Sequence, residues 1–560
     1  MQQPTCDAPP CVEPFNAARR AGAAASVSAA SAALAACGGS SSGDTTPPPP
    51  PATGTSTEQA ARFLTQATFS ASDAAIARVQ ALGYSAWLDE QASVAGSPSH
   101  VDWMVAKGYN AVANVNSFAG VDNTLWRKFI ASPDPLRQRI TFALSEIFVI
   151  SMAGLPVAWR GFAVAAYVDL LAANCFANFR TLLENVTLSG GMGVYLNMRG
   201  NQKENAATGR QPDENYAREV LQLFSIGLYQ LNTDGGLELD AGGKPIETYD
   251  QATISGLAKV FTGWDFDGYS QTDPAFMSKP MTFNAAKFST ASKTFLGTTI
   301  PGSTDGVTAL RIALDTIFNH PNVGPFIARQ LIQRLVTSNP SAAYIGRVAE
   351  TFNDNGAGVR GDLKAVVKAV LLDAEVRTDT PPTAADWGKV REPVHRFIQW
   401  ARTYGAASPT DLWNVGDLSD PATRLGQSPL RSPSVFNFFR PGYVPPNTPI
   451  GAMGLVAPEL QITNESTVVG YANFMQTTIS GGRGEVVPDY SAELALAADA
   501  NALVDRCALL LAGAGVSATT KATIASAVGS IAASTDAGKL NRVRAAIHLV
   551  MCSPEYLVQK

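Results

Sequence analysis

The chain has 560 residues and a net charge of −5, with 46% hydrophobic and 16% charged residues. This composition supplies enough apolar material for a large core, and the lack of any run of five or more lysines and arginines argues against a nucleic-acid partner. Only four histidines are present and they stand far apart, so we expect no histidine-rich metal site and no cofactor.

The first predicted element in chain order is an export signal. Arg19 and Arg20 precede a weakly apolar, alanine-rich run that ends in the sequence LAAC, whose last residue is Cys37. A positive patch followed by an apolar run is typical of a signal peptide, and the LAAC sequence resembles the lipobox of bacterial lipoproteins. We therefore expect a signal peptide at residues 1–36 and a lipid on Cys37.

A tether follows the cysteine. Residues 37–57 are rich in glycine, serine and proline, which is the composition of a flexible and then partly stiff linker. An alanine-rich leader with an unrelated cysteine is the alternative, and it gives no reason for such a linker. The sequence thus predicts export and a lipid anchor in the bacterial envelope, in the outer membrane, facing the periplasm or the surface.

Residues 58–560 are predicted to form one large, mainly α domain of many helices with one or two short β-hairpins. Apolar residues recur at helical spacing in most segments. A hairpin is indicated at 227–249, where two β-prone runs flank Asp234-Gly235-Gly236, and a second extended piece is indicated at 293–302. Residues 405–465, rich in proline, glycine, serine and asparagine, predict a long irregular excursion.

The segment DENYAREVLQLFSIGLY, residues 213–229, holds the densest set of polar candidates. Stepping 100° per residue places its polar side chains on one side of a helix and its apolar ones on the other. This stripe is either the solvated side of an amphipathic helix or a set of directional hydrogen-bonding groups. The residues are Glu214, Asn215, Arg218, Glu219 and Gln222.

The next predicted helix ends in the sequence FTGWD, and an intervening hairpin would fold the two helices antiparallel. Trp264 and Asp265 would then share a cleft with Arg218. In that cleft Glu214 and Glu219 are candidate acid/base residues, Arg218 would steady a carboxylate, and Trp264 would stack on a substrate. Because Glu214 and Glu219 lie about 140° apart round one helix, Asp265 is the better second carboxylate. Asn215 and Gln222 are candidate binding residues.

A second candidate surface is the segment RSPSVFNFFRPGYVPP, residues 431–446. It interleaves phenylalanines with Arg440 and Tyr443. Exposed, it would bind sugar rings or a partner; buried, it would plug the core.

Several segments, in order, resemble the bacterial family known as domain of unknown function 1800. They are DENYAREVLQLFSIGLYQLN, AKVFTGWDF, KTFLG, FIARQLIQRLV and SVFNFFRPGY. The resemblance implies an exported helical protein, often encoded beside a second exported family similar to sulfatases, with no established reaction. Many members carry W-H-x-H-F in an early helix, where this chain has Ser145 and Glu146. Roles held by those histidines therefore do not transfer to this chain, and no metal site is expected.

Two functions are consistent with these features. One is a lipid-anchored binding or assembly component that works with another exported protein, for which the family resemblance suggests the sulfatase-like one. The other is an envelope hydrolase that acts on a polysaccharide or another polymer through the carboxylate and arginine site.

Overall fold

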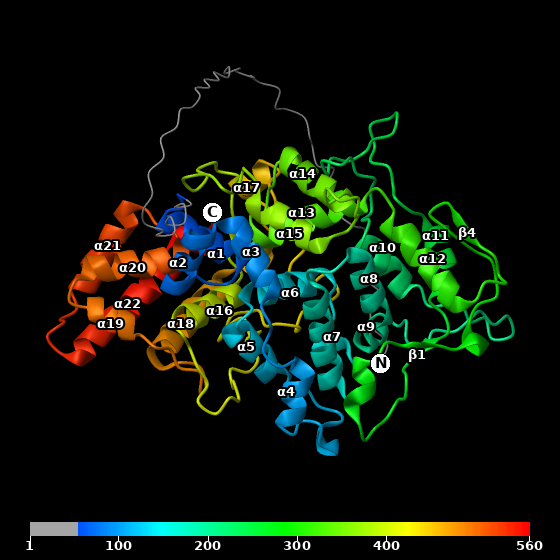
Figure 1. Ribbon diagram of the computed structural model, residues 1–560, viewed down its shortest axis with the longest axis horizontal. Helices are drawn as coiled ribbons and strands as arrows, with labels where there is room; N and C mark the ends of the chain where they lie inside the picture. The colour runs from blue at the N-terminus through cyan, green and yellow to red at the C-terminus, as the bar shows by residue number, and fades with distance from the viewer. Residues whose placement is uncertain (1–53, 514) are drawn as a thin grey trace, which may run out of the picture.

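The computed structural model describes residues 54–513 and 515–560 (Figure 1). Within these residues the chain forms 23 α-helices and three two-stranded sheets, which confirms the mainly α fold. The expected signal peptide, Cys37 and nearly all of the tether lie outside the described residues.

The helices are α1 (Thr57–Ala67), α2 (Asp73–Leu82), α3 (Tyr84–Ser93), α4 (His100–Ala106), α5 (Val121–Ala131), α6 (Pro135–Ile147), α7 (Arg160–Asn174), α8 (Phe179–Leu188), α9 (Gly190–Tyr195), α10 (Asn215–Gln222), α11 (Gln251–Val260), α12 (Gly306–Phe318), α13 (Val323–Leu335), α14 (Ala342–Asn353), α15 (Leu363–Leu372), α16 (Pro393–Thr403), α17 (Pro449–Ala452), α18 (Glu465–Gly481), α19 (Ser491–Leu496), α20 (Ala500–Ala512), α21 (Ala518–Gly529), α22 (Asp536–Cys552) and α23 (Pro554–Leu557). The strands are β1 (Trp264–Asp265), β2 (Thr282–Phe283), β3 (Lys293–Phe295), β4 (Thr298–Ile300), β5 (Lys389–Val390) and β6 (Val558–Gln559).

Many helices begin at a polar side chain that caps the free amides of the first turn. The Ser56 side chain accepts from the Gln59 backbone amide, and the Gln59 side chain accepts from the Ser56 backbone amide. These two hydrogen bonds form a capping box before α1. Asp250 starts α11 in the same manner by accepting from the Thr253 amide. These caps fix where the helices that carry the candidate residues start.

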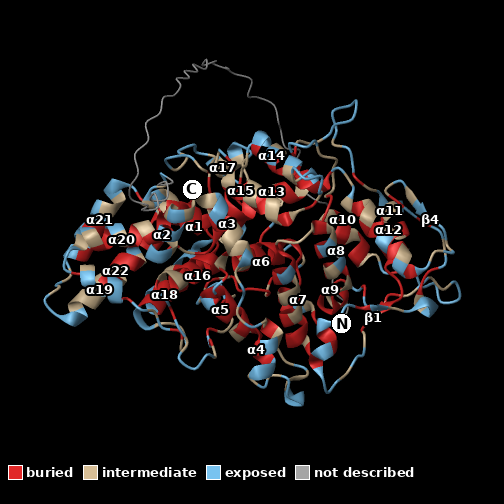
Figure 2. Ribbon diagram, in the orientation of Figure 1, coloured by how far each residue is buried: buried red, intermediate tan, exposed pale blue. Residues whose placement is uncertain are grey.

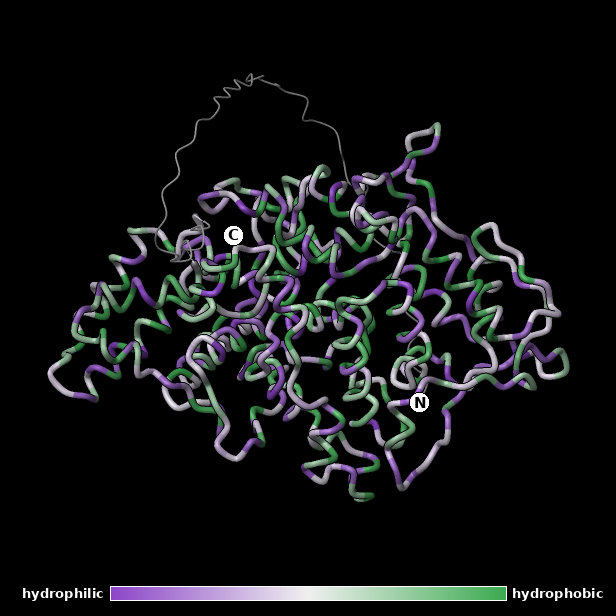
Figure 3. The backbone as a smooth tube through the Cα atoms, viewed as in Figure 1, coloured by the Kyte–Doolittle hydropathy of each residue, from purple (hydrophilic) through white to green (hydrophobic). Residues whose placement is uncertain are grey.

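Helices α6, α7 and α16 occupy the middle of the molecule and are largely buried (Figures 1 and 2). Helices α18–α22 gather at one end, and α8–α12 at the other. Hydrophobic and hydrophilic residues alternate along most helices (Figure 3), as in helices that bury one side and expose the other. The candidate residues of α10 and α11 thus lie toward one end, away from the central layer.

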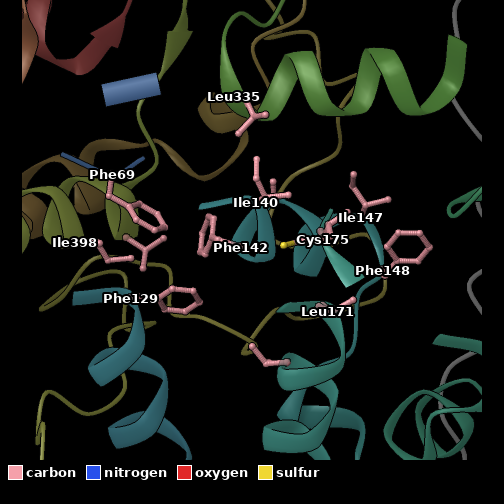
Figure 4. Close-up of a cluster of buried hydrophobic side chains, with 14 of the residues drawn as sticks. Phe69, Phe129, Ile140, Phe142, Ile147, Phe148, Leu171, Cys175, Leu335 and Ile398 are labelled. Atoms are coloured by element: carbon pink, nitrogen blue, oxygen red, sulfur yellow. The ribbon is translucent and has the colours of Figure 1, made fainter. Parts of the chain in front are cut away.

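The centre of the core is aromatic and aliphatic (Figure 4). Phe69, Phe129 and Phe142 meet edge to face, with ring centroids 5.6–6.0 Å apart. Such contacts are favoured over parallel stacking by the charge distribution of the rings. Cys175 is buried against this core as a free thiol, as expected for a lone cysteine.

The short sheets include the expected hairpins. Strands β3 and β4 pair antiparallel in the extended piece expected at 293–302. The hairpin expected at 227–249 is held by antiparallel bridges between Tyr229 and Glu247 and between Leu231 and Leu237. Strands β5 and β6 add a pairing that no local pattern indicated, because it joins residues far apart in the sequence.

The excursion at 405–465 is irregular, with one short α-helix, α17, and one 3-10 turn, Pro458–Ile462. It is not a free surface loop. Gln427, Ser428 and Glu459 are each at most 2% exposed, so parts of this segment belong to the interior.

Among the described residues, no helix combines the length and the apolar character needed to cross a bilayer.

Candidate functional site

Helices α10 and α11 pack antiparallel, as the intervening hairpin predicts. The Tyr249 hydroxyl, just before α11, donates to Gln222 Oε1 at the end of α10 (3.4 Å). At the start of α10, the Ser255 hydroxyl from the middle of α11 donates to Glu214 Oε1 (2.6 Å). The Tyr216 ring in the first turn of α10 meets the Phe261 ring at the end of α11 edge to face, with centroids 4.9 Å apart, so the start of α10 lies beside the end of α11.

Glu214 is the centre of a hydrogen-bond network between the two helices. Its Oε1 accepts from Ser255, and its Oε2 accepts from Gln251 Nε2 (2.7 Å) and Arg218 Nη2 (3.4 Å). The arginine also reaches Gln251 Oε1 at 3.5 Å. Both carboxylate oxygens are thus engaged within the protein, and the network joins α10 to α11.

Glu219 has a different environment, since it is only 7% exposed. Its Oε2 has no hydrogen-bond partner within the described residues. Burial raises the pKa of its carboxyl to about 7, and the nearby Arg218 charge only partly opposes this. Burial raises the pKa of Tyr195 and of Tyr249, and the Glu219 charge raises both further. Both phenols therefore lie close to Glu219. The polar stripe is therefore not wholly solvated.

The remaining stripe residues lie at the edge of the helix. Asn215 is half-buried, and its backbone amide donates to the Asp213 side chain (2.9 Å), which shapes the first turn of α10. Gln222 is half-buried and is held by Tyr249.

The FTGWD segment is brought close to the start of α10 through Asn201. The Gly263 amide donates to the Asn201 carbonyl (2.9 Å), and the Asn201 side chain exchanges two hydrogen bonds with the Asp213 backbone. The two segments therefore meet as expected, although their functional side chains face different surroundings.

Trp264 and Asp265 do not join the network around Arg218. Trp264 is 4% exposed and packs against Phe283, with ring centroids 5.5 Å apart, so its indole cannot stack on a ligand at the surface. Asp265 instead forms ion pairs with Arg199 (2.9 Å) and Lys287 (3.2 Å). These cations and the Phe266 amide lower the pKa of its carboxyl, although partial burial acts in the opposite direction. The expected single recess is replaced by two separate polar groups.

An open surface groove of about 570 Å³ lies at Asp265. Arg199, Tyr269 and Asn284 line it together with Asp265. The Arg199 guanidinium sits over the Phe266 ring at 4.3 Å and donates through Nε to Asp265, so its orientation is fixed. Sequence reasoning found Asp265 but missed Arg199 and Tyr269, which stand outside the recognised motifs.

The second candidate surface is divided between solvent and core. Arg440 is exposed, and its guanidinium lies 4.9 Å from the ring of Phe436, which is 38% exposed. Phe439 is 5% exposed and belongs to the interior. Tyr443 is half-buried, and its backbone carbonyl accepts from the Ala457 amide. The segment is thus neither a continuous exposed surface nor a fully buried part of the core.

A buried group of ionisable side chains, which sequence reasoning missed, lies where α6, α13, β5 and α16 meet. Lys389, 3% exposed, approaches Glu459 Oε1 at 3.2 Å and Glu392 Oε1 at 3.6 Å. Glu146, 6% exposed, lies 3.8 Å from Arg334 Nε. The pairing of Lys389 with Glu392 and Glu459 is what makes these buried charges tolerable. Its one sequence signal was the replacement of the family histidines by Ser145 and Glu146.

The carboxyls of Glu146 and Glu392 influence each other's ionisation inside this group. Burial and the Glu392 charge raise the pKa of Glu146 well above its ordinary range. For Glu392, burial opposes ionisation, but the Lys389 charge and the hydrogen bond from Gln427 outweigh burial and lower the pKa. Glu146 therefore holds the proton and Glu392 the charge.

The cavity beside Glu146 has a volume of only about 20 Å³. That is room for a single water molecule and not for a substrate. Within the described residues, no group of three or more His, Cys, Asp and Glu side chains is arranged to hold a metal ion. We therefore assign this buried group to the stability of the fold.

The fold and these sites define a large helical protein with an open polar groove at one end. The chain belongs to the family described as "Protein of unknown function (DUF1800)", whose model matches residues 62–558, and this confirms the resemblance of its motifs. Comparison with curated proteins returned no match, and neither did comparison with solved structures.

Proposed function

We propose that this protein is an exported, lipid-anchored binding component of the bacterial envelope that acts through the groove beside β1. The lipobox-like sequence ending at Cys37 and the Gly/Ser/Pro tether after it support the anchor. The anchor would hold the helical domain at a membrane surface while leaving it free to reorient.

The observation that favours binding over catalysis is the state of the carboxylates. Both carboxylate oxygens of Glu214 accept hydrogen bonds from side chains of α11. Both carboxylate oxygens of Asp265 form ion pairs, one with Arg199 and one with Lys287. Glu219 is buried and is not among the residues that line the groove. A carboxylate that is saturated by the protein holds structure together and is poorly placed to move protons on a substrate.

The partner in this proposal is a second exported macromolecule. The family resemblance suggests a sulfatase-like protein as one such partner, encoded nearby. The groove offers the docking surface, since it combines fixed charges with an exposed tyrosine.

A hydrolase remains the second candidate, because a carboxyl with a pKa of about 7 suits a general acid. It requires a motion that exposes Glu219. Glu219→Gln separates the two functions: a hydrolase loses turnover of its polymer, whereas a binding component keeps its ligand affinity.

Photo-crosslinking in membranes tests the binding role. A photoreactive residue replaces Tyr269 in the groove or, as a control, Val307, which is 57% exposed on α12. We expect crosslinks to an envelope macromolecule from position 269 and few from 307. The Cys37→Ser chain should leave the membrane fraction. Equal crosslinking from both positions would refute the groove as the binding surface.

A further inference from the structure

Tyr269 lies at the junction of two surface grooves. One is the groove of about 570 Å³ beside β1, and the other has about 320 Å³ and is lined by Arg160, Asn116 and Gln271. Both are lined by Tyr269, so they adjoin at this residue, and the two grooves together are called the trough below. Each part has the size of a site for a small ligand, so the whole suits several linked units of a chain.

The tyrosine is held rigidly with one part of its ring in solvent. It is 48% exposed. Its ring stacks on Phe266 with centroids 6.0 Å apart and planes 16° apart, and meets Phe276 edge-on at 5.3 Å. A fixed aromatic side chain presents apolar area at little cost in conformational entropy. This shelf fits the apolar face of a sugar ring.

Planar polar groups flank the shelf on both sides. Asp265 and Asn284 line one part of the trough, and Asn116 and Gln271 line the other. The Gln271 side chain also donates to the Tyr269 hydroxyl (3.4 Å). Amide and carboxylate groups suit directional hydrogen bonds of the kind that neighbouring hydroxyls of a sugar offer.

Two arginines in the trough retain donors that the protein does not use. Arg160 Nε is buried and has no hydrogen-bond partner within the described residues. Arg199 donates to Asp265 through Nε, and among the described residues no acceptor bonds to its terminal nitrogens Nη1 and Nη2. A buried donor without an acceptor, such as Arg160 Nε, is costly, and a ligand that brings acceptors removes that cost. The Arg199 side chain is 36% exposed, so it can bond to a ligand at the surface. Guanidinium groups pair most strongly with carboxylates.

The sign of the charge selects the class of ligand. Asp265 supplies one negative charge against the two positive charges of Arg199 and Lys287, and Arg160 adds a further positive charge along the trough. A neutral sugar would satisfy the shelf and leave Arg160 without an anion. A sugar that carries a carboxylate would satisfy both.

We propose that the trough binds a linear acidic polysaccharide, with one sugar ring on Tyr269 and carboxylates at Arg160 and Arg199. This inference rests on the binding role proposed above and names its ligand.

The test measures binding of the full-length, detergent-solubilised protein to polygalacturonate and to dextran, which lacks carboxylates. We expect polygalacturonate to bind and dextran not to bind. Tyr269→Ala and Arg160→Gln should each weaken binding by about ten-fold or more, as truncated tyrosine and arginine anchors do. Tyr229→Ala and Arg311→Gln, outside the trough, are the matched controls and should change it little. Thermal unfolding of all four variants verifies the fold.

Each of the other outcomes of the binding test would refute a defined part of the proposal. Equal binding of dextran and polygalacturonate, both lost in Tyr269→Ala, would overturn the acidic class. Polygalacturonate binding that Tyr269→Ala and Arg160→Gln leave intact would overturn the trough. Failure to bind either polymer, with crosslinking from position 269 to a protein, would overturn the polysaccharide and leave the binding role standing. Failure of both assays would overturn both proposals.

Discussion

Glu219→Gln should make the protein more stable at alkaline pH and leave it nearly unchanged at acidic pH. The carboxyl has a pKa of about 7 in the folded protein because it is buried, against an ordinary value of 4.5. Glutamine has the same shape as the protonated acid and carries no charge. It therefore mimics the form that the folded state prefers.

The magnitude follows from the difference between the two pKa values, about 2.5 pH units at roughly 1.4 kcal/mol each, or about 3.5 kcal/mol. The sign is fixed by proton binding. Below pH 4.5 both states hold the proton, and the contribution of this group to stability is fully present. As the pH rises toward 7 the unfolded chain loses its proton first, and this contribution is lost. Above pH 7 the wild-type chain thus bears a penalty that the variant lacks.

Urea unfolding at pH 5 and pH 8.5 measures the effect as the difference between variant and wild type at each pH. This subtraction cancels the other groups that titrate. Glu214→Gln is the matched control: Glu214 accepts from both Ser255 and Gln251, so an amide there places a donor against donors and should cost about 1–3 kcal/mol at both pH values. Equal destabilisation by Glu219→Gln at pH 5 and 8.5 would show that the native carboxylate is ionised and paired, which would refute the reasoning.

Two further predictions concern packing and buried charge. Glu146→Gln should leave the free energy of unfolding nearly unchanged, because Glu146 holds a proton. Glu392→Gln removes the charge that faces Lys389 and should cost about 3–5 kcal/mol in urea unfolding at pH 7. Equal losses of stability in the two variants would contradict this assignment of the proton. Gly256→Ala should cost about 3 kcal/mol or more, because its Cβ would lie 1.9 Å from a backbone oxygen of β3. In Gly529→Ala the new Cβ would meet nothing closer than 3.8 Å, so this variant should be neutral or stabilising. Thermal unfolding compares the two alanine variants, and similar melting temperatures would contradict the packing around Gly256.

Periodicity predicted the helical class well because most helices bury one face, and that pattern is local in the sequence. It predicted helix ends less well. A helix was expected from residue 213 up to the hairpin at 227, but α10 ends at Gln222. The amides of Ile226 and Gly227 both bond to the Leu221 carbonyl, and Gly227 has a φ of 73°, so the chain unwinds there.

The candidate site was predictable only in part. The antiparallel pairing of α10 and α11 follows from the short hairpin between them. The direction of each side chain does not, because Trp264 turned toward Phe283 to bury its indole and Asp265 turned toward Arg199. The group around Glu146 and Lys389 could not be predicted either, since it draws one residue from each of several distant segments.

The pairing of β5 with β6 sets the order in which the molecule can be completed. Lys389 reaches its final surroundings only when Gln559 lies beside it, and Lys560 is bonded through its carbonyl to Gln66 of α1. The centre of a newly made chain can therefore close only after residues 558–560 have been synthesised. A chain truncated before residue 558 would retain nearly every helix and leave the interior open to proteases.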